Sequence, residues 1–377
     1  MTNGNEAAPR LAFLIGTVSG GTARHVVALA AGCAAEGLPV SVYGPEETRP
    51  LFAAATAFTP VMISDRPRPA RDVRAMLGLR RQFAAARPDV VHAHGVRAGA
   101  FGALALLGLA RRTGPALAVT VHNGPPESRP GRAVYGVLER ICARRGDAVL
   151  CASPDLAARM RRLGAADVQQ FDVPAAPAQP PSAAAVAKAG ADIGAGGRPV
   201  VLAVGRLAPQ KGFDILIAAA ARWAERTPAP RTVIAGGGPL AAGLAAQARQ
   251  DGADVLLLGD RDDVPALLAN ADVFVLPSRW EARALILQEA LRAGRAVVAT
   301  RSGGTPSLTG EEAAILVPPE DPAELAAAVS SVLDDPALAT RLQRAAVVRA
   351  ASFPTQEDAV RTACTLYRRL AADRAPT

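Results

Sequence analysis

Aromatic residues are scarce in this sequence. Phe, Trp and Tyr together make up 4% of its 377 residues, although half of all residues are hydrophobic. The core must therefore be built mainly from Ala, Val and Leu side chains, and a chain of this length can bury enough of them to form two domains. We expect no nucleic-acid partner, because neither aromatic residues for base stacking nor a recognised binding motif accompanies the basic residues.

Cysteine is also rare, and its spacing matches neither a zinc site nor a disulfide framework, which predicts reduced thiols. The four cysteines are Cys33, Cys142, Cys151 and Cys364. The four histidines are His25, His92, His94 and His122. Three of these histidines could gather as a zinc site, but no carboxylate or cysteine accompanies them at the spacing of metal ligands. We therefore expect neither a metal nor a cofactor.

Long hydrophobic runs are missing. The longest, residues 98–110, lies between Arg97 and Arg111 and is shorter than the ~20 apolar residues of a membrane span. The N-terminus has no basic region ahead of an apolar core and a cleavage site, as a secretory signal would have. These absences predict a cytoplasmic protein.

The net charge of +8 belongs to the first half of the chain, because residues 1–185 hold 21 Arg and Lys against 13 Asp and Glu. Part of the excess is clustered at Arg66, Arg68, Arg71, Arg74, Arg80 and Arg81. Apolar residues alternate with this cluster at near-helical spacing, including Val73 and Leu77. Such a helix could hold the protein peripherally on the anionic inner face of a membrane. A solvated, arginine-rich helix face would give the same pattern.

Apolar strands alternate with helices in both halves of the chain, which predicts two doubly wound, Rossmann-like α/β domains with a cleft between them. The first domain is expected over residues 1–175 and the second over residues 199–351. Between them, residues 176–198 are rich in Pro and Gly and are expected to form a linker. The predicted strands cover residues 11–18, 40–43, 90–92, 117–122, 148–152, 200–204, 232–235, 255–258, 273–276, 296–299 and 315–317.

One stretch of the second half, residues 277–291, follows a predicted strand and continues into an amphipathic helix. Glu281 would lie in the loop at the carboxyl end of the strand, where open α/β sheets bind ligands. Glu289 would lie roughly 7 Å further along the helix axis. Between them, the amides of residues 284–286 suit an anion such as a diphosphate. An ordinary loop glutamate followed by a surface glutamate would show the same spacing.

Two cations are expected near this stretch. Arg206 follows the first strand of the second domain, and Lys211 precedes the next helix. A guanidinium fork beside a compact ammonium suits a diphosphate. Lysine is rare here, since Lys188 and Lys211 are the only two among 42 basic residues. A lysine in such a turn suggests a position where arginine does not fit, although Lys188 shows that chance could also place one.

Two phosphate-binding motifs are missing. Neither residues 16–21 nor residues 236–239 supply the Gly-x-Gly-x-x-Gly dinucleotide fingerprint, and the Gly205 to Gly212 segment is not a P-loop. Other motifs remain: Gly-Gly-x-x-x-His at 20–25, Pro-Asp-Val-Val-His-Ala-His at 88–94, Thr-Val-His-Asn at 120–123, Gly-Arg-Leu followed by Lys-Gly at 205–212, Gly-Gly-Gly-Pro-Leu at 236–240, and the Glu281 and Glu289 pair.

In order and spacing, these motifs resemble those of family 4 (group 1) glycosyltransferases from about residue 11 to residue 350. The resemblance implies the GT-B architecture, with the acceptor mostly on the first domain and the nucleotide sugar mostly on the second. It also implies that residues 352–377 contain a helix returning to the first domain. Sugar transfer would retain the anomeric configuration and would require no metal. Asp260-Arg261-Asp262 looks like a metal-binding pair, but its place before a helix with Asp263 predicts helix N-capping instead.

The resemblance also implies roles for single residues. Its catalytic residues are His122, Glu281, Arg206 and Lys211. Its donor-binding residues are Gly21, Arg206, Lys211, Ala284, Leu285, Ile286 and Glu289. The two cations would hold the diphosphate, Glu281 the sugar hydroxyls and Glu289 the ribose hydroxyls. Gly21 would let its backbone approach the phosphate, His122 would contact the sugar near the reacting carbon, and the leaving phosphate would take the acceptor proton.

We therefore expect a retaining, metal-independent glycosyltransferase that moves a sugar from a UDP- or GDP-sugar to a hydroxyl acceptor. Two alternatives remain open. A catalytically silent GT-B homologue is suggested by Ala282, where the family usually has glycine, and by Ser307, where it commonly has glutamate. The other alternative is a nucleotide-sugar epimerase, which would release an altered donor without an acceptor.

Overall fold

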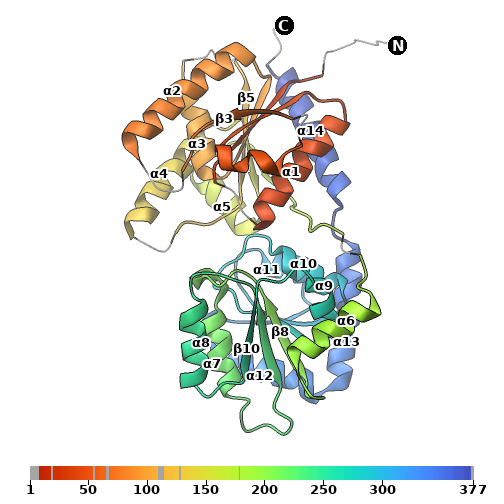
Figure 1. The fold of residues 1–377 in the computed structure, drawn as a ribbon. Helices are drawn as coiled ribbons and strands as arrows, with labels where there is room; N and C mark the ends of the chain where they lie inside the picture. Colours follow the sequence, from red (N-terminus) through yellow and green to blue (C-terminus); the bar gives the residue numbers. More distant parts are fainter. Residues whose placement is uncertain are drawn as a thin grey trace, which may run out of the picture. The chain divides into compact units, whose positions relative to one another are not determined.

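The computed structural model describes residues 8–17, 20–53, 56–64, 68–108, 114–126, 129–177 and 179–374. The chain divides into two compact units (Figure 1). Unit 1 comprises the chain up to Pro174 together with the chain from Pro354, and unit 2 comprises Ala175–Phe353. Among the described residues, no helix is both long and apolar enough to span a membrane.

Unit 1 is built on a seven-stranded parallel sheet with the order β3-β2-β1-β4-β5-β6-β7. Its strands are β1 Leu11–Ile15, β2 Val40–Gly44, β3 Ala57–Pro60, β4 Val90–His94, β5 Ala116–Val121, β6 Ala148–Cys151 and β7 Val168–Gln170. Its helices are α1 Gly20–Ala35, the 3₁₀ helix η1 Glu46–Leu51, α2 Pro69–Ala86, α3 Val96–Ala105, α4 Arg129–Arg145, α5 Pro154–Arg162 and α14 Gln356–Ala372. Every residue of β1, β4 and β5 is buried, as expected of parallel strands covered on both faces.

Unit 2 is built on a six-stranded parallel sheet with the order β10-β9-β8-β11-β12-β13. Its strands are β8 Val200–Val204, β9 Arg231–Ala235, β10 Val255–Gly259, β11 Val273–Leu276, β12 Ala296–Thr300 and β13 Ile315–Val317. Its helices are α6 Ala183–Ile193, η2 Pro209–Lys211, α7 Phe213–Ala221, α8 Ala241–Gln250, α9 Val264–Ala269, α10 Leu285–Arg292, α11 Thr305–Thr309, α12 Pro322–Asp334 and α13 Pro336–Ala351. The strand order reverses at β8, which pairs with β9 on one side and with β11 on the other.

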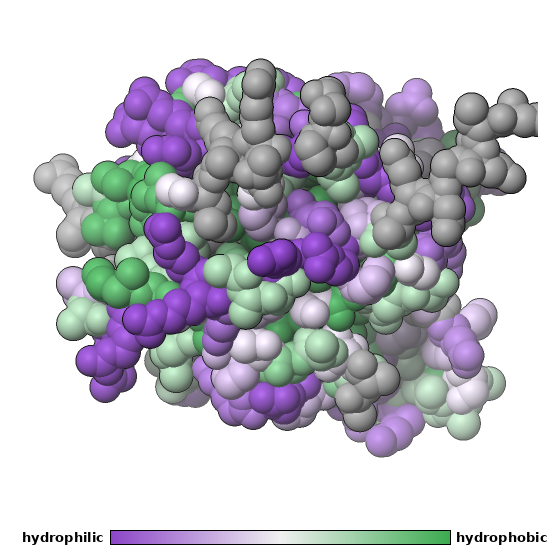
Figure 2. All heavy atoms as spheres, turned by 90° about the horizontal axis from the view of Figure 1, so that it is seen from above, coloured by the Kyte–Doolittle hydropathy of each residue, from purple (hydrophilic) through white to green (hydrophobic). Residues whose placement is uncertain are grey.

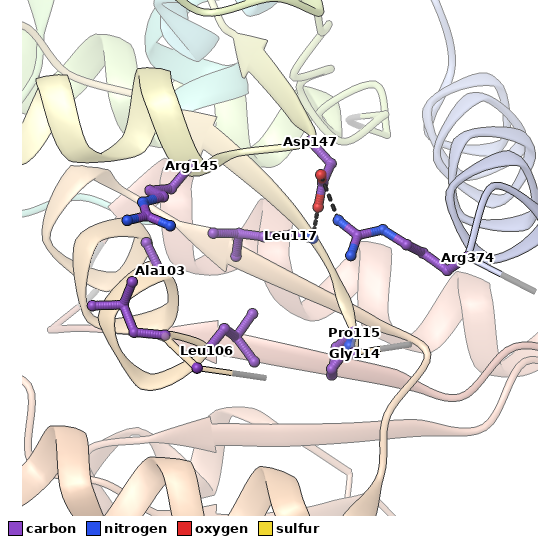
Figure 3. A pocket seen from close by; sticks show the side chains of 10 residues that line it. Ala103, Leu106, Gly114, Pro115, Leu117, Arg145, Asp147 and Arg374 are labelled. Atoms are coloured by element: carbon purple, nitrogen blue, oxygen red, sulfur yellow. Dashed lines mark hydrogen bonds and ion pairs between the residues drawn. The ribbon is translucent and has the colours of Figure 1, made fainter. Parts of the chain in front are cut away.

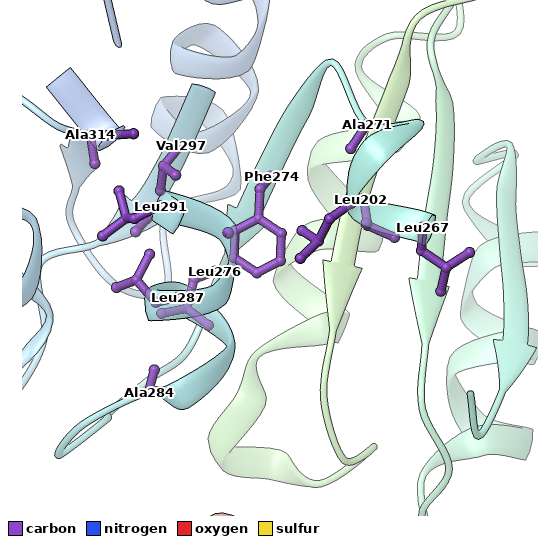
Figure 4. Packing of buried hydrophobic residues seen from close by; sticks show 14 of the residues in the cluster. Leu202, Leu267, Ala271, Phe274, Leu276, Ala284, Leu287, Leu291, Val297 and Ala314 are labelled. Carbon is purple, nitrogen blue, oxygen red and sulfur yellow. The ribbon is translucent and has the colours of Figure 1, made fainter. Parts of the chain in front are cut away.

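Helix α10 is held on the unit 2 sheet by its apolar face. Leu287 and Leu291 of α10 belong to one fully buried cluster with Phe274 of β11 and Leu202 of β8 (Figure 4). Burying a leucine side chain stabilises a fold by about 1.5–3 kcal/mol. This packing fixes where α10 begins and therefore where its first-turn amides lie.

The predicted fold of two doubly wound α/β domains is confirmed, but the predicted linker over residues 176–198 is wrong in its centre. Residues 183–193 form α6, whose N-cap Ser182 accepts a hydrogen bond from the Ala185 amide at 3.2 Å. Ala189 and Ile193 of α6 are buried in the unit 2 core. The flanking prolines and glycines favoured the prediction of a linker. The segment between them is rich in alanine, the residue with the highest helix propensity.

Helix α14 packs against α1 in unit 1 (Figure 1). The two helices bring together the Sγ atoms of Cys33 and Cys364, which are 3.6 Å apart. All four cysteines are free and buried. Burial raises the pKa of the Cys151 thiol to about 12, and it also raises the pKa of Cys33. These thiols therefore stay protonated and unreactive in the folded protein.

Candidate functional site

Lys211 and Glu281 meet at the carboxyl edge of the unit 2 sheet. Lys211 ends η2, in the connection that follows β8, and Glu281 lies in the loop between β11 and α10. Since β8 and β11 are parallel neighbours, their following loops emerge at the same edge. The Lys211 Nζ lies 2.6 Å from Glu281 Oε1. A cation and a carboxylate that are 70 positions apart in the chain thus form one ion pair.

The Glu281 carboxylate is buried and held in place by neighbouring hydroxyl groups. Its Oε1 also accepts a hydrogen bond from Ser278 Oγ at 2.8 Å. The carbonyl oxygen of Ser278 in turn accepts hydrogen bonds from Ser302 Oγ at 3.1 Å and from Thr300 Oγ1. Among the described residues, no group donates to Glu281 Oε2. One carboxylate oxygen is therefore fixed by the protein, while the other keeps its acceptor capacity.

Two glycines allow the surrounding loops to approach each other. Gly303 has φ +53°, and a Cβ there would stand 2.0 Å from the carbonyl oxygen of Glu281. The next amide, that of Gly304, donates to this same oxygen at 2.7 Å. Gly212 has φ +64°, and its Cβ would stand 2.1 Å from the carbonyl oxygen of Pro277. No L side chain fits at either position without displacing the loop that carries Glu281.

Arg279 joins the same two loops from the other side. Its guanidinium binds the Asp214 carboxylate of α7 with two hydrogen bonds of 2.9 and 2.7 Å, which lowers the pKa of that carboxyl group. The Arg279 amide donates to the Gln210 carbonyl, and the Gln210 side chain donates to the Trp280 carbonyl, both at 2.8 Å. Sequence reasoning missed Ser278, Arg279 and Gln210, although each lies within three positions of a predicted site residue.

Arg206 and the start of α10 supply further positive charge to unit 2. Arg206 follows β8 and is exposed, and its side chain makes no hydrogen bond or ion pair with the part of the chain that is described. Helix α10 begins at Leu285, and the side chain of its N-cap Ala284 offers no capping hydrogen bond. The amides of its first turn, including that of Ile286, therefore lack a side-chain acceptor and carry the positive end of the helix dipole.

Glu289 lies in the second turn of α10 and is half-buried. Burial lowers the pKa of the Arg292 guanidinium, one turn further on. The negative charge of Glu289 partly offsets this lowering. The structure thus brings Lys211 and Glu281 into contact and places Glu289 on the helix that follows them. Arg206 lies at the end of the same strand that leads to Lys211.

The predicted N-capping role of the acidic residues before α9 is wrong. Asp263 occupies the N-cap position, but its side chain accepts no hydrogen bond from the helix amides. It binds Arg261 instead, with hydrogen bonds of 2.7 and 2.6 Å. Arg261 also forms a 2.8 Å ion pair with Asp192 of α6, and Asp260 accepts a hydrogen bond from the Gly237 amide at 2.6 Å. Asp263 thus binds a guanidinium in place of the helix amides, and α6, which occupies the predicted linker, supplies the second carboxylate for this guanidinium.

In unit 1, the four histidines gather at the carboxyl ends of β4 and β5. His94 Nδ1 lies 3.4 Å from His122 Nε2, and the ring of His25 lies 5.9 Å from that of His122. His92 binds Tyr367 and Thr120 side chains at 2.5 and 2.6 Å. All four rings are buried, and burial lowers the pKa of His25 to about 4 and that of His122 to about 3. The cluster is therefore neutral at pH 7.

The described side chains of this histidine cluster do not form a metal-binding site. Within the described ranges, no group of three or more His, Cys, Asp or Glu side chains could hold a metal ion.

Gly21 lies in the first turn of α1, which follows β1. His122 and Gly21 therefore belong to unit 1, whereas the other predicted site residues belong to unit 2.

A small cavity of about 60 Å³ lies at the opposite, amino edge of the unit 1 sheet (Figure 3). Asp147, which precedes β6, accepts a hydrogen bond from the Leu117 amide at 2.8 Å and pairs with Arg374 at 2.6 Å. Asp147 and Arg374 thus pair with each other, and Asp147 is also bound to the backbone (Figure 3). The edge is also the wrong one for ligand binding in a parallel sheet, so this ion pair is structural.

Two family models match the chain. The model described as Glycosyl transferases group 1 matches residues 198–335, and the model described as Glycosyltransferase Family 4 matches residues 19–170. The first match contains Arg206, Lys211, Glu281 and Glu289, and the second contains Gly21 and His122.

Known proteins resemble parts of this chain or its fold. An alpha-D-kanosaminyltransferase from Streptomyces kanamyceticus is 34% identical over 162 residues, which are 41% of this chain and 42% of that protein. A D-inositol 3-phosphate glycosyltransferase from Salinispora arenicola is 35% identical over 168 residues, which are 41% of this chain and 38% of that protein. The chain thus spans about two fifths of the length of these relatives.

Among solved structures, Anabaena HepE in complex with UDP is 19% identical, with a TM-score of 0.79 over 96% of this chain and 100% of that chain. At this identity the likeness shows the GT-B fold. Together, the two family models account for both units of the structure, and the chain belongs to the group 1 glycosyltransferases of the family 4 type.

Proposed function

We propose that this protein is a retaining, metal-independent glycosyltransferase that moves a sugar from a UDP- or GDP-sugar to a hydroxyl group of an acceptor. The observation that carries the proposal is the 2.6 Å pair of Lys211 and Glu281 at the carboxyl edge of the unit 2 sheet. The ammonium suits the anionic diphosphate of a nucleotide sugar. The carboxylate beside it suits the hydroxyl donors of the sugar.

Each of the predicted site residues of unit 2 would bind a different part of the nucleotide-sugar donor. The Lys211 ammonium has three N–H donors, and one of these is used by Glu281, so two are available for diphosphate oxygens. Arg206 adds a guanidinium fork that matches phosphate geometry. The α10 amides at Leu285 and Ile286 add the positive end of a helix. Glu281 Oε2 would accept from the sugar hydroxyls, and Glu289 from the ribose hydroxyls.

This set of charges also accounts for the chemistry. As the bond between the sugar and the diphosphate breaks, negative charge grows on the leaving phosphate, and fixed cations and amides offset it. The leaving phosphate would then take the acceptor proton on the same face of the sugar, which retains the anomeric configuration. In unit 1, His122 would contact the sugar near the reacting carbon as a neutral ring, and Gly21 would let its backbone approach the phosphate.

Titration calorimetry with UDP- and GDP-sugars, followed by turnover with an acceptor panel, tests this proposal. We expect micromolar to millimolar affinity for one nucleotide sugar, acceptor-dependent release of its nucleoside diphosphate, and the same rate in EDTA. Proton NMR of the product should show the anomeric configuration of the donor. Tight binding without turnover would identify a silent homologue, and release of an altered donor sugar without an acceptor would identify an epimerase.

We further propose that α2 lets unit 1 lie on an anionic membrane surface. Helix α2 buries Leu79 and Phe83, while Val73 and Leu77 are 51% and 54% exposed beside exposed arginines such as Arg74. Figure 2 shows hydrophobic residues among hydrophilic ones on the side of unit 1 where α2 lies. Exposed apolar side chains bordered by arginine are the pattern of an interfacial helix.

Vesicle co-sedimentation distinguishes this contact from a solvated, arginine-rich face. We expect the protein to sediment with phosphatidylglycerol vesicles at low salt, to bind less as salt rises, and to stay in solution with phosphatidylcholine vesicles. The double variant Val73→Asp/Leu77→Asp should lose this binding. The matched control is Val347→Asp/Val348→Asp, since both valines are exposed on α13 of unit 2. Absence of binding to anionic vesicles at low salt would leave the solvated face as the explanation.

A further inference from the structure

Arg279 lies two positions before Glu281, in the loop that follows β11. Resting on the proposed function, we propose that Arg279 is a positioning residue of the donor site. It holds the turn that carries Lys211 against the loop that carries Glu281, and it does not itself bind the diphosphate. Its effect on the reaction is therefore exerted through Lys211.

Hydrogen bonds join the two loops residue by residue up to the ion pair. The carbonyl oxygen of Pro209 accepts from Arg279 Nη1 at 2.7 Å. The carbonyl oxygen of Gln210 accepts from the Arg279 amide at 2.8 Å, and the Gln210 side chain donates to the carbonyl oxygen of the residue after Arg279, also at 2.8 Å. Lys211 then donates to Glu281 at 2.6 Å. Arg279 thus binds both residues that precede Lys211 in η2.

The guanidinium of Arg279 is fully engaged by two carboxylates. Asp214, in the first turn of α7, accepts from Nη1 at 2.9 Å and from Nη2 at 2.7 Å. Glu320, which follows β13, accepts from Nε at 2.9 Å. Two carboxylates around one guanidinium leave a net charge of about −1, which disfavours a diphosphate at this point. Arg279 therefore stabilises the loops of the site, whereas the exposed Arg206 keeps its charge for a ligand.

Glu320 reaches Arg279 from a strained backbone conformation. Its φ is +62°, and it is one of two non-glycine residues with a positive φ in the described part of the chain. This region is sparsely populated by residues that carry a side chain. Backbone strain of this kind is found mostly at functional sites, which favours a role of Arg279 and its partners in the site over a role in the general stability of unit 2.

A second arginine of unit 2 forms a similar fork at the other edge of the sheet. Arg226, between α7 and β9, binds the Asp334 carboxylate of α12 with hydrogen bonds of 3.1 and 2.5 Å. The connection that enters β9 lies at the amino edge, since ligand-binding loops of a parallel sheet leave the carboxyl ends of its strands. Arg226 is therefore a matched control for Arg279.

Acetylation of the two lysines tests the positioning role without a donor. Lys188 and Lys211 are the only lysines of the chain, and Lys188 is exposed on α6, so it serves as an internal reference. With acetic anhydride and peptide mass spectrometry, we expect Arg279→Gln to raise the rate at Lys211 relative to Lys188 severalfold, because the turn is no longer bound to the other loop. Asp214→Asn breaks the same fork from the side of α7 and should also raise this ratio.

The control Arg226→Gln should leave the acetylation ratio unchanged. Thermal unfolding of each variant shows whether the protein is folded under the labelling conditions. An unchanged ratio in Arg279→Gln and Asp214→Asn, or an equal rise in Arg226→Gln, would overturn the proposal.

Turnover of the nucleotide sugar tests whether Arg279 acts through Lys211. We expect Arg279→Gln to lower kcat at least about tenfold, because a small displacement of a group that stabilises the transition state lowers the rate. In Lys211→Ala, the same substitution should lower kcat by no more than about twofold further, because its target is already absent. Arg226→Gln should keep the wild-type rate. Full additivity in the double variant would show a direct contact of Arg279 with the donor and refute the positioning role.

The outcome is separable from that of the proposed function. Acetylation requires no donor, so a protein that turns over no nucleotide sugar can still show or lack the rise at Lys211. Conversely, turnover by the wild type together with an unchanged acetylation ratio in Arg279→Gln and Asp214→Asn would support the transferase and refute the role of Arg279.

Discussion

Replacing Lys211 by alanine is expected to lower the turnover of the nucleotide sugar by at least about a hundredfold, the usual loss when one group that stabilises transition-state charge is removed. Lys211 is the cation that contacts the buried Glu281 carboxylate at 2.6 Å, so its removal takes away both a diphosphate partner and the counter-charge of the sugar-binding carboxylate. Glu281→Ala should abolish turnover as well. Stopped-assay quantification of the released nucleoside diphosphate measures both effects.

Lys188→Ala is the matched control, because Lys188 is the only other lysine of the chain and lies exposed on α6. It should keep the wild-type rate. Since Lys211→Ala leaves a buried carboxylate without its cation, which by itself costs stability, the double variant Lys211→Ala/Glu281→Ala separates the two effects. It should recover thermal stability without recovering turnover. A wild-type rate in Lys211→Ala or Glu281→Ala would refute the donor site.

Acidification from pH 7 to pH 4 is expected to destabilise unit 1 strongly through its buried histidines. The pKa of His25 falls from 6.5 to about 4 on folding, and that of His122 falls to about 3, in both cases mainly because burial disfavours the charged ring. The unfolded chain therefore binds more protons than the folded one below pH 6.5. This stability is fully present above pH 6.5 and is lost as the pH falls through the window from 6.5 to about 4.

The size of this effect follows from the pKa shift. A shift of one pKa unit corresponds to about 1.4 kcal/mol, so His25 alone should cost on the order of 3 kcal/mol at pH 4, out of a stability of roughly 5–15 kcal/mol for a typical domain. Urea unfolding at pH 7, 5.5 and 4, followed by circular dichroism, measures the loss. Carboxylates also titrate in this range, so the wild-type slope by itself does not identify the histidine.

The variant His25→Phe shows how much of the stability loss at low pH comes from His25. Both ring nitrogens of His25 are buried without hydrogen-bond partners among the described residues, and the ring packs edge-on against Phe171 at 5.7 Å. A phenyl ring can occupy this site and does not titrate. The variant should lose less stability than wild type between pH 6.5 and pH 4, and an identical slope in the two proteins would contradict the assignment.

Much of the fold could be predicted from the sequence because its signals are local. Parallel strands buried on both faces read as continuous apolar runs, and β8, β11 and β13 begin and end at the predicted residues. The placement of Lys211 and Glu281 in loops after β8 and β11 could be predicted for the same reason. Helix α6 was not predicted, because the prolines and glycines on either side of it are typical of a linker.

The sequence by itself determined the two parallel sheets, their loops and the kinds of side chain that those loops carry. Only the tertiary structure decided which of these side chains touch. The contacts of Lys211 with Glu281 and of Arg279 with Asp214 join residues 70 and 65 positions apart, and the bond of His92 to Tyr367 spans 275 positions. Strand order and loop packing set such contacts, and neither follows from local pattern. For that reason the cations and carboxylates could be predicted as candidates, whereas their pairing and the neutral histidine cluster could not.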